Sequence, residues 1–186
     1  NGMESMSNLK ELTWEHHKRA ETRAFVKEMF SGNMDPKKYA YYLYQQHAMY
    51  DALEAMAMMH GIFNGMPELR RAPSIIEDAN ELWPNDIARP QLLPSTQEYG
   101  KHLLSIMNDK DKIMAHVYVR HMGDLSGGQM IAKKVPGKGR YYKFDRDAME
   151  LKEMIRSQLD DSMADEAKVC FDFATKLFEE MAEVNL

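Results

Sequence analysis

The sequence predicts an all-α fold, a single bundle of about 7 or 8 helices that pack at steep angles. Apolar residues recur at helical spacing through long segments, and glycine and proline fall at the expected ends of these segments. No alternating pattern is long enough for a sheet. A chain of 186 residues can bury one sizeable core. We therefore expect residues 1–186 to form one domain, with 1–8 as a disordered tail.

The first half of the chain begins with two expected long helices. Residues 7–31 carry apolar side chains at helical spacing and end before Gly32. Asp35 can then cap a helix whose first residue is Pro36, because a first-turn proline loses no hydrogen bond. The second helix should run from there to Gly61.

Two further helices are expected where serine precedes glutamate by three residues. Ser74 with Glu77 and Ser95 with Glu98 have the spacing of a capping box, in which each side chain bonds a free backbone N–H of the first turn. The prolines between these two segments predict a loop.

The second half predicts three more helices. Residues 109–135 form the fifth, which ends at Pro136, and the following "GKGRYYKF" is expected to be loop or a short extended piece. Asp145 should cap the next helix, residues 146–161, and a last helix should cover 164–184.

Composition narrows the class of function. The formal net charge of −5 argues against nucleic acid as a general partner. No apolar run approaches the roughly 20 residues of a membrane helix, and the opening residues lack the apolar centre of a signal peptide. The lone Cys170 excludes an internal disulfide and is expected to be a buried thiol. We expect a soluble, monomeric, cytoplasmic protein.

The stretch "GDLSGGQ", residues 123–129, places three glycines inside an expected helix. LSGGQ is also the signature of ATP-binding-cassette ATPases, whose loop caps a nucleotide. Such proteins need a G-x-x-x-x-G-K-[ST] phosphate loop, and this chain has none. The ATPase interpretation is therefore disfavoured.

A second explanation for the glycines is close packing against another helix, which would need only Gly123 and Gly127. Each interior glycine costs about 1 kcal/mol relative to alanine, and the adjacent Gly127 and Gly128 double that cost at a place where they also allow a kink. A bare, bent backbone with Asp124 and Ser126 beside it suits a flat ligand that presses on the main chain.

A flat ligand with a metal needs an axial donor, and the first helix offers one. His17 falls on one helical stripe with Lys10, Thr13 and Glu21, and Glu21 lies one turn after it, where its carboxylate can orient the imidazole. No H-E-x-x-H motif or pair of E-x-x-H motifs supports a dinuclear metal site. Taken alone, His17 would be an ordinary histidine.

Together these motifs resemble heme oxygenase over residues 9–182, in the soluble form found in cyanobacteria, plastids and their phages. The resemblance is carried by Thr13-x-x-x-His17-x-x-Ala20-Glu21, Tyr50 in "MYDALE", Arg120 in "YVRHMGDLSGGQ", and Lys152 with Arg156 in "LKEMIRSQ".

The family implies a heme-oxygenase-like bundle that holds heme b between two helices. His17 would ligate the iron from the proximal side, and Gly123, Ser126, Gly127 and Gly128 would cover the distal face with room for O₂. The family opens heme at a meso carbon, here most simply the α carbon, to biliverdin, CO and ferrous iron.

The resemblance also assigns roles around the heme. Asp124 matches the distal aspartate that holds a proton-delivering water network, and Arg120 and Tyr50 match further members of that network. The residues expected to contact the propionates or the heme edge are Lys10, Tyr118, Lys152, Arg156 and Phe171, whereas Phe178 is expected in the core.

Some positions depart from the family pattern. Trp14 stands where many relatives carry a basic residue, which weakens the propionate grip at one edge or replaces charge with stacking. His121 and Met122 stand in place of the more usual Tyr-Leu.

No flavin or nicotinamide fingerprint is present, so the electrons must come from outside. Two basic clusters could steer a ferredoxin or similar small acidic reductant, and a downstream bilin reductase could take the product. These clusters, which an ordinary solvated helix face would explain equally well, are Lys18, Arg19, Arg23 and Lys27, and Lys133, Lys134, Lys138 and Arg140.

Two alternatives stay open from the sequence. A heme carrier of the same fold would need His17 but neither Asp124 nor an electron donor. An enzyme of the related thiaminase-like fold would need an acidic or cysteine nucleophile in the bundle, for which Cys170 is a poor candidate.

Overall fold

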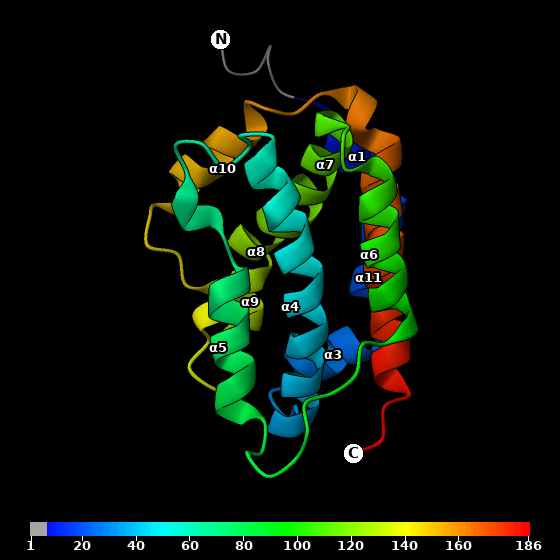
Figure 1. The fold of residues 1–186 in the computed structure, drawn as a ribbon, viewed down its shortest axis with the longest axis vertical. Coiled ribbons are helices and arrows are strands. Elements are labelled where there is room, and N and C mark those ends of the chain that lie inside the picture. The colour runs from blue at the N-terminus through cyan, green and yellow to red at the C-terminus, as the bar shows by residue number, and fades with distance from the viewer. Residues whose placement is uncertain (1–6) are drawn as a thin grey trace.

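The computed structural model describes residues 7–186 as a bundle of helices joined by short loops (Figure 1). No β-strand occurs in that range, and the prediction of an all-α domain is confirmed. The helices are α1 (Leu9–Leu12), α2 (Trp14–Glu21), α3 (Ala24–Phe30), α4 (Pro36–Met59), α5 (Ala72–Leu82), α6 (Pro94–Ile106), α7 (Lys110–Val117), α8 (Gly123–Leu125), α9 (Gly128–Ile131), α10 (Ala148–Arg156) and α11 (Ala164–Ala182). Four short helical segments join them, namely η1 (Pro67–Leu69), η2 (Tyr118–Met122), η3 (Arg140–Tyr142) and η4 (Asp161–Met163).

Helix α4 is the central element. It packs against α5, α6 and α7, and the consecutive residues 42–46 are all buried, so more than one full turn is covered on every side. Asp35 caps the helix as expected, because its Oδ2 accepts a hydrogen bond of 3.0 Å from the Lys38 amide.

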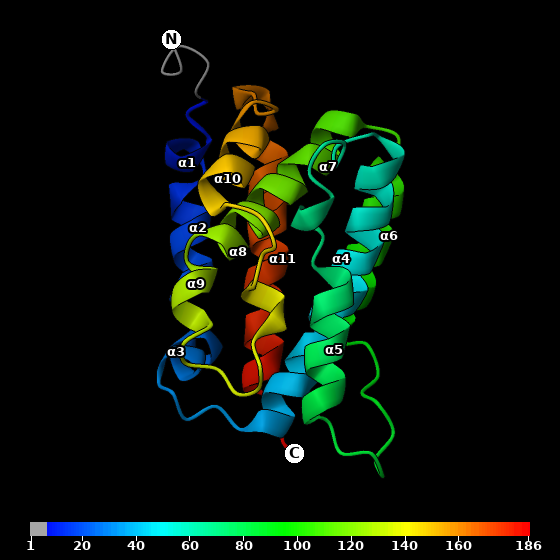
Figure 2. The same ribbon diagram turned by 90° about the vertical axis from the view of Figure 1, so that its left-hand side faces the viewer.

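Helix α11 forms the second long support of the bundle. It packs against α2, α3, α6 and α7, so the C-terminal helix holds the N-terminal segments in place. Figure 2 shows α2 and α9 at the left of the molecule, with α4 and α5 at the right. The cavity described below lies between these segments.

The first predicted helix is broken into α1, α2 and α3. Thr13 ends α1, and its hydroxyl donates to the Leu9 carbonyl at 2.6 Å, a local bond that competes with regular helix geometry. Arg23 then adopts an extended backbone before α3. The prediction of one continuous helix was wrong, although the chain is helical on both sides of each break.

The predicted capping residues differ from the observed ones. Helix α5 begins at Ala72, two residues before Ser74, and α6 begins at Pro94. Ser95 is instead engaged with Glu180 of α11, a tertiary contact that local spacing cannot reveal. Asp147, not Asp145, caps α10 by accepting from the Glu150 amide at 3.1 Å.

The glycine-containing helix is interrupted twice. After α7 the chain widens into the π-helical η2, and α8 then ends at Ser126, whose φ of −110° and ψ of −96° are not helical. Segment η3 follows where loop or extended chain was expected. The kink allowed by the glycines is therefore present, and the π-helical turn before it was not foreseen.

The expected N-terminal tail falls mostly outside the described residues. Residues 1–6 are not described, whereas the Asn8 amide donates to Asp161 Oδ1 at 2.7 Å and fixes the start of α1. Among the described helices, none combines the length and hydropathy needed to span a bilayer.

Replacing Gly128 with alanine should destabilise the fold. A Cβ atom there would lie 2.7 Å from Cδ1 of Tyr142, whose buried ring is stacked on Tyr141 with centroids 4.1 Å apart and has no room to retreat. We expect Gly128→Ala to lower the free energy of unfolding by about 1–3 kcal/mol in urea titrations of the apoprotein. Gly127→Ala is the matched control, because its Cβ would meet nothing within 4 Å. Equal stability of the two variants would contradict this packing account.

Candidate active site

A cavity of about 680 Å³ lies between the N-terminal helices and the broken distal helix. This volume is within the range of small-molecule and cofactor sites. Its lining is mostly apolar, with side chains from α3, α9 and α11 that include Val26, Met29, Phe30, Ile131 and Phe178. A large flat apolar group would be removed from water here. Phe178, expected only in the core, lines this cavity and also packs against Phe25.

His17 stands on one wall of the cavity, on α2. Its Nε2 lies 3.3 Å from Glu21 Oε2, and its ring stacks on Phe171 with centroids 5.1 Å apart and planes inclined by 11°. The edge of Trp14 meets the same ring at 5.5 Å. The carboxylate and the two aromatic rings together hold the plane of the imidazole, with Nε2 on the side of Glu21.

The opposite wall is bare main chain. Gly123, Ser126 and Gly127 line the cavity and are exposed, and a Cβ on either glycine would meet nothing within 4 Å. The space before them is therefore open, and side chains there would occupy it. An imidazole facing a naked backbone fits a flat macrocycle with an axially ligated metal.

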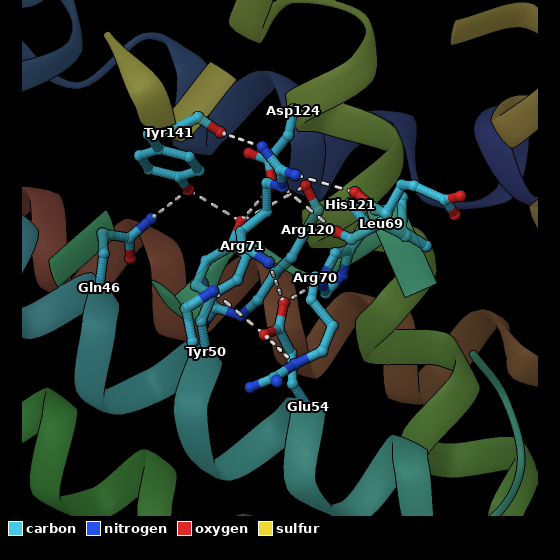
Figure 3. A network of polar contacts seen from close by, with 12 residues as sticks. Gln46, Tyr50, Glu54, Leu69, Arg70, Arg71, Arg120, His121, Asp124 and Tyr141 are labelled. Atoms are coloured by element: carbon cyan, nitrogen blue, oxygen red, sulfur yellow. Dashed lines mark hydrogen bonds and ion pairs between the residues drawn. The ribbon is translucent and has the colours of Figure 1, made fainter. Parts of the chain in front are cut away.

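A buried chain of hydrogen bonds ends at Asp124 (Figure 3). The Tyr50 hydroxyl donates to Asp124 Oδ2 at 2.7 Å, the Tyr141 hydroxyl donates to Tyr50 at 2.9 Å, and Gln46 Nε2 donates to Tyr141 at 3.1 Å. These four residues come from α4, α8 and η3. The chain ties three separate segments together at the distal side of the cavity.

Burial raises the pKa of Asp124 to about 7. The nearby His121 and the hydrogen bond from Tyr50 oppose this shift without cancelling it. A carboxyl group with a pKa near neutrality can both accept and release a proton under ordinary conditions.

Arg120 does not form the surface pair with Asp124 that helical spacing allows. Its Nε donates to the Tyr99 hydroxyl at 3.0 Å, and its guanidinium lies 4.4 Å from the centroid of that ring. Arg120 and Asp124 are both buried. Arg120 lies in the π-helical η2 and Asp124 in α8, and the two side chains engage different partners, Tyr99 and Tyr50.

His121 connects the distal helix to α4 and α5. Its Nε2 lies 2.8 Å from Glu54 Oε2, and Glu54 also accepts hydrogen bonds from the amides of Arg71 and Ala72 at 2.6 and 3.1 Å. Figure 3 shows this second cluster beside the Tyr50–Asp124 pair. Sequence reasoning registered His121 only as a departure and missed its structural role.

The side chains expected to bind the propionates are present at the cavity, with one exception. Lys10, Tyr118 and Arg156 belong to the lining, whereas Lys152 is half-buried on α10 and is not part of it. Apart from Lys152, every residue predicted for the site lines the cavity. Lys152 and Arg156 are four residues apart, but Arg156 is at the last turn of α10, nearer the cavity.

Sequence reasoning missed Tyr141 and Gln46. Tyr141 was part of an expected loop, and Gln46 carried no motif, because their hydroxyl and amide become functional candidates only when η3 folds onto α4. The adjacent aromatic residues in "RYYKF" were the single local signal of a buried segment.

The helical bundle and the cavity define a protein that can hold a flat, anionic, metal-containing macrocycle against one histidine. Consistent with this class, the family model for heme oxygenase matches residues 3–180. The chain belongs to the heme oxygenase family, whose members degrade heme to biliverdin.

Relatives and solved structures agree with this membership. A heme oxygenase of Porphyra purpurea is 30% identical, over 95% of this chain and 86% of the relative. Heme oxygenase 2 of Synechocystis is also 30% identical, over 84% and 71% of the two chains. The heme oxygenase of Leptospira interrogans superposes with a TM-score of 0.80 at 28% identity, over 92% of this chain and 97% of that one. A Synechocystis heme oxygenase-1 in complex with heme shares the fold, with a TM-score of 0.83 at 24% identity over 94% and 90%.

The raised pKa of Asp124 predicts how stability changes with pH. The unfolded carboxyl ionises near its ordinary value of 3.8, whereas the folded one keeps its proton to about 7. Between these values the folded state binds more protons, so the free energy of unfolding falls as the pH rises. From pH 5 to pH 8 the apoprotein should lose about 3 kcal/mol relative to Asp124→Asn, because about 1.4 kcal/mol is lost for each pH unit between pH 5 and the folded pKa of about 7 and little more above it.

Urea unfolding of both apoproteins at pH 5 and pH 8 measures this difference. Tyr50 can still donate to the amide oxygen of the variant, so the hydrogen bond at this position is conserved. Parallel pH dependence of the two proteins would show that Asp124 titrates near its ordinary value.

Proposed function

We propose that this chain opens heme at the α-meso carbon to biliverdin, CO and ferrous iron, with O₂ and externally supplied electrons. The observation that carries the proposal is the opposition of His17 and the bare Gly123–Gly127 backbone across one apolar cavity, with buried Asp124 beside the backbone. We further propose that it acts as a cytoplasmic monomer and that its product passes to a bilin reductase.

His17 is the proposed iron ligand. Bound heme supplies the redox-active iron and is itself the substrate. The Glu21 carboxylate lies 3.3 Å from Nε2 and orients the imidazole, and Phe171 supports the face of the ring. The protein thereby holds one imidazole nitrogen toward the cavity.

The bare backbone and Asp124 control the distal side. The glycines keep the space in front of the backbone free for a small diatomic ligand, because a Cβ would occupy part of that open space. Asp124 holds and returns a proton through ordered water, and Tyr50 and Tyr141 keep its carboxyl group in one orientation. Arg120 is a buried cation beside this network: its guanidinium lies 5.5 Å from the centroid of the Tyr50 ring and is held in place by the Tyr99 hydroxyl.

The rotation of heme in the cavity decides which meso carbon is attacked. Lys10, Arg156 and Tyr118 line the cavity and can bind the two propionates, of which an arginine can hold one by two hydrogen bonds. Lys152 lies one helical turn from Arg156 but away from the lining, so its proposed role is the weaker one.

Electrons are proposed to come from ferredoxin or a similar small acidic protein. Lys18, Arg19 and Lys27 are exposed on the same N-terminal segments as His17, which brings a positive surface close to the proximal side. In the second cluster, Arg140 pairs with Asp78 and Glu81 of α5 and is less available to a partner.

Hemin titration followed by turnover tests the proposal. The wild-type protein should develop a Soret band and, with ferredoxin, its reductase and NADPH under air, replace it with a broad red bilin absorption. His17→Ala should lose turnover, because no other histidine lines the cavity among the described residues. Asp124→Ala should retain the Soret band but form little biliverdin, because its proton relay is gone.

Circular dichroism of both apoproteins is the control for folding, and His47→Ala, a half-buried histidine outside the cavity, is the matched control for losing an imidazole. A stable Soret band in the reduced wild-type system would favour a heme carrier. Normal biliverdin formation by His17→Ala would remove His17 as the ligand.

Arg156 and Lys152 offer a test of regiospecificity. Arg156→Ala should shift part of the product from the α isomer to another biliverdin isomer, because one propionate loses its partner at the cavity wall. Lys152→Ala should change the isomer ratio much less. Chromatography of the extracted bilins measures both ratios, and a larger shift in Lys152→Ala would reverse the proposed order of the two residues.

A further inference from the structure

A second cluster of ligand-type side chains lies outside the residues used so far. His102 of α6, His116 of α7 and Glu166 of α11 meet where these three helices pack against one another (Figure 1). One ligand atom from each residue lies within 4.8 Å of the other two. These residues do not line the heme cavity. We propose that His102, His116 and Glu166 bind a divalent transition-metal ion of the zinc type.

The arrangement of protons at the cluster favours a cation. Both imidazole Nε2 atoms lie 2.7 Å from the same carboxylate oxygen, Oε2 of Glu166. Without a metal, each imidazole must place a proton on this nitrogen. A divalent ion replaces both protons and satisfies the same three atoms, because neutral imidazole nitrogens and a carboxylate are metal ligands.

The geometry requires only side-chain adjustments, because the three ligand atoms already lie within 4.8 Å of one another. Zinc–ligand bonds of about 2.1 Å at tetrahedral angles separate ligand atoms by about 3.4 Å. The present contacts of 2.7 Å are shorter, so the carboxylate would move back by less than an ångström. The side chain of His102 is 25% exposed, which leaves an entry path and a coordination position for water.

The second nitrogen of His116 is already held. Its Nδ1 lies 2.7 Å from the Tyr99 hydroxyl, so Nε2 is directed toward Glu166. Metal-bound histidines are oriented in this way by a partner on the other ring nitrogen. The His116 side chain is fully buried, and it cannot turn away without breaking both contacts.

The donor set identifies the class of metal. Two imidazoles and one carboxylate suit zinc, and ferrous iron or cobalt have similar preferences, whereas magnesium and calcium require mostly oxygen ligands. The Tyr99 hydroxyl also accepts from Arg120, which lines the cavity. Tyr99 therefore connects the proposed metal site to the cavity, because its hydroxyl contacts both His116 and Arg120. Metal binding itself does not depend on heme.

Isothermal titration of the tag-free apoprotein with Zn²⁺ tests the inference. We expect one saturable ion per chain, and His102→Gln should weaken this binding at least about tenfold, because losing one of three ligands removes a coordinate bond. His102 is at the rim and outside the cavity, so the variant should bind hemin as the wild type does.

The pair His17 and Glu21 is the competing zinc site, and His17→Ala is its control. Loss of the ion in His17→Ala with full binding in His102→Gln would overturn the proposal, as would zinc binding unchanged in both variants. A zinc anomalous peak between His102, His116 and Glu166 in a soaked crystal supports it, and a peak elsewhere with none at this position refutes it.

Discussion

The break in the distal helix is the constraint on which the rest of the site depends. Regular helix from α7 to α9 would carry side chains across the wall where Gly123 and Gly127 now expose bare backbone. The π-helical η2 and the irregular Ser126 make the helix bend, and π-helical turns of this kind often mark functional sites. The bent backbone has little stability of its own, because adjacent glycines favour the unfolded chain.

Tertiary contacts supply what the broken helix lacks. Gly128 rests on the Tyr142 ring, and His121 is bound to Glu54, which also accepts backbone hydrogen bonds from the start of α5. On the other side, Asp124 accepts from Tyr50 of α4. Buried polar groups of this kind are costly unless every partner is present, so they hold the bend in a single arrangement.

The same burial that holds the bend gives Asp124 its chemistry. A carboxyl group at the surface would be ionised at neutral pH, whereas burial raises the pKa of this one to about 7. Stability is lost when the folded protein must ionise it, and the gain is a group that exchanges a proton at the wall of the cavity. The fold thus pays in stability for a proton relay beside the proposed heme site.

The sequence by itself determined the all-α class and the helix α4 with its Asp35 cap, because periodicity and capping are local properties. The pairing of His17 with the glycine stretch was an expectation from the resemblance to heme oxygenase, because no local pattern places the two segments together. Only the tertiary structure decided that Ser95 bonds Glu180 and that Lys152 lies away from the cavity. It also brought Tyr141 to Tyr50, and it brought His102 and His116 to Glu166. These contacts join residues far apart in the chain, and their energy depends on burial and on partners that no local pattern contains.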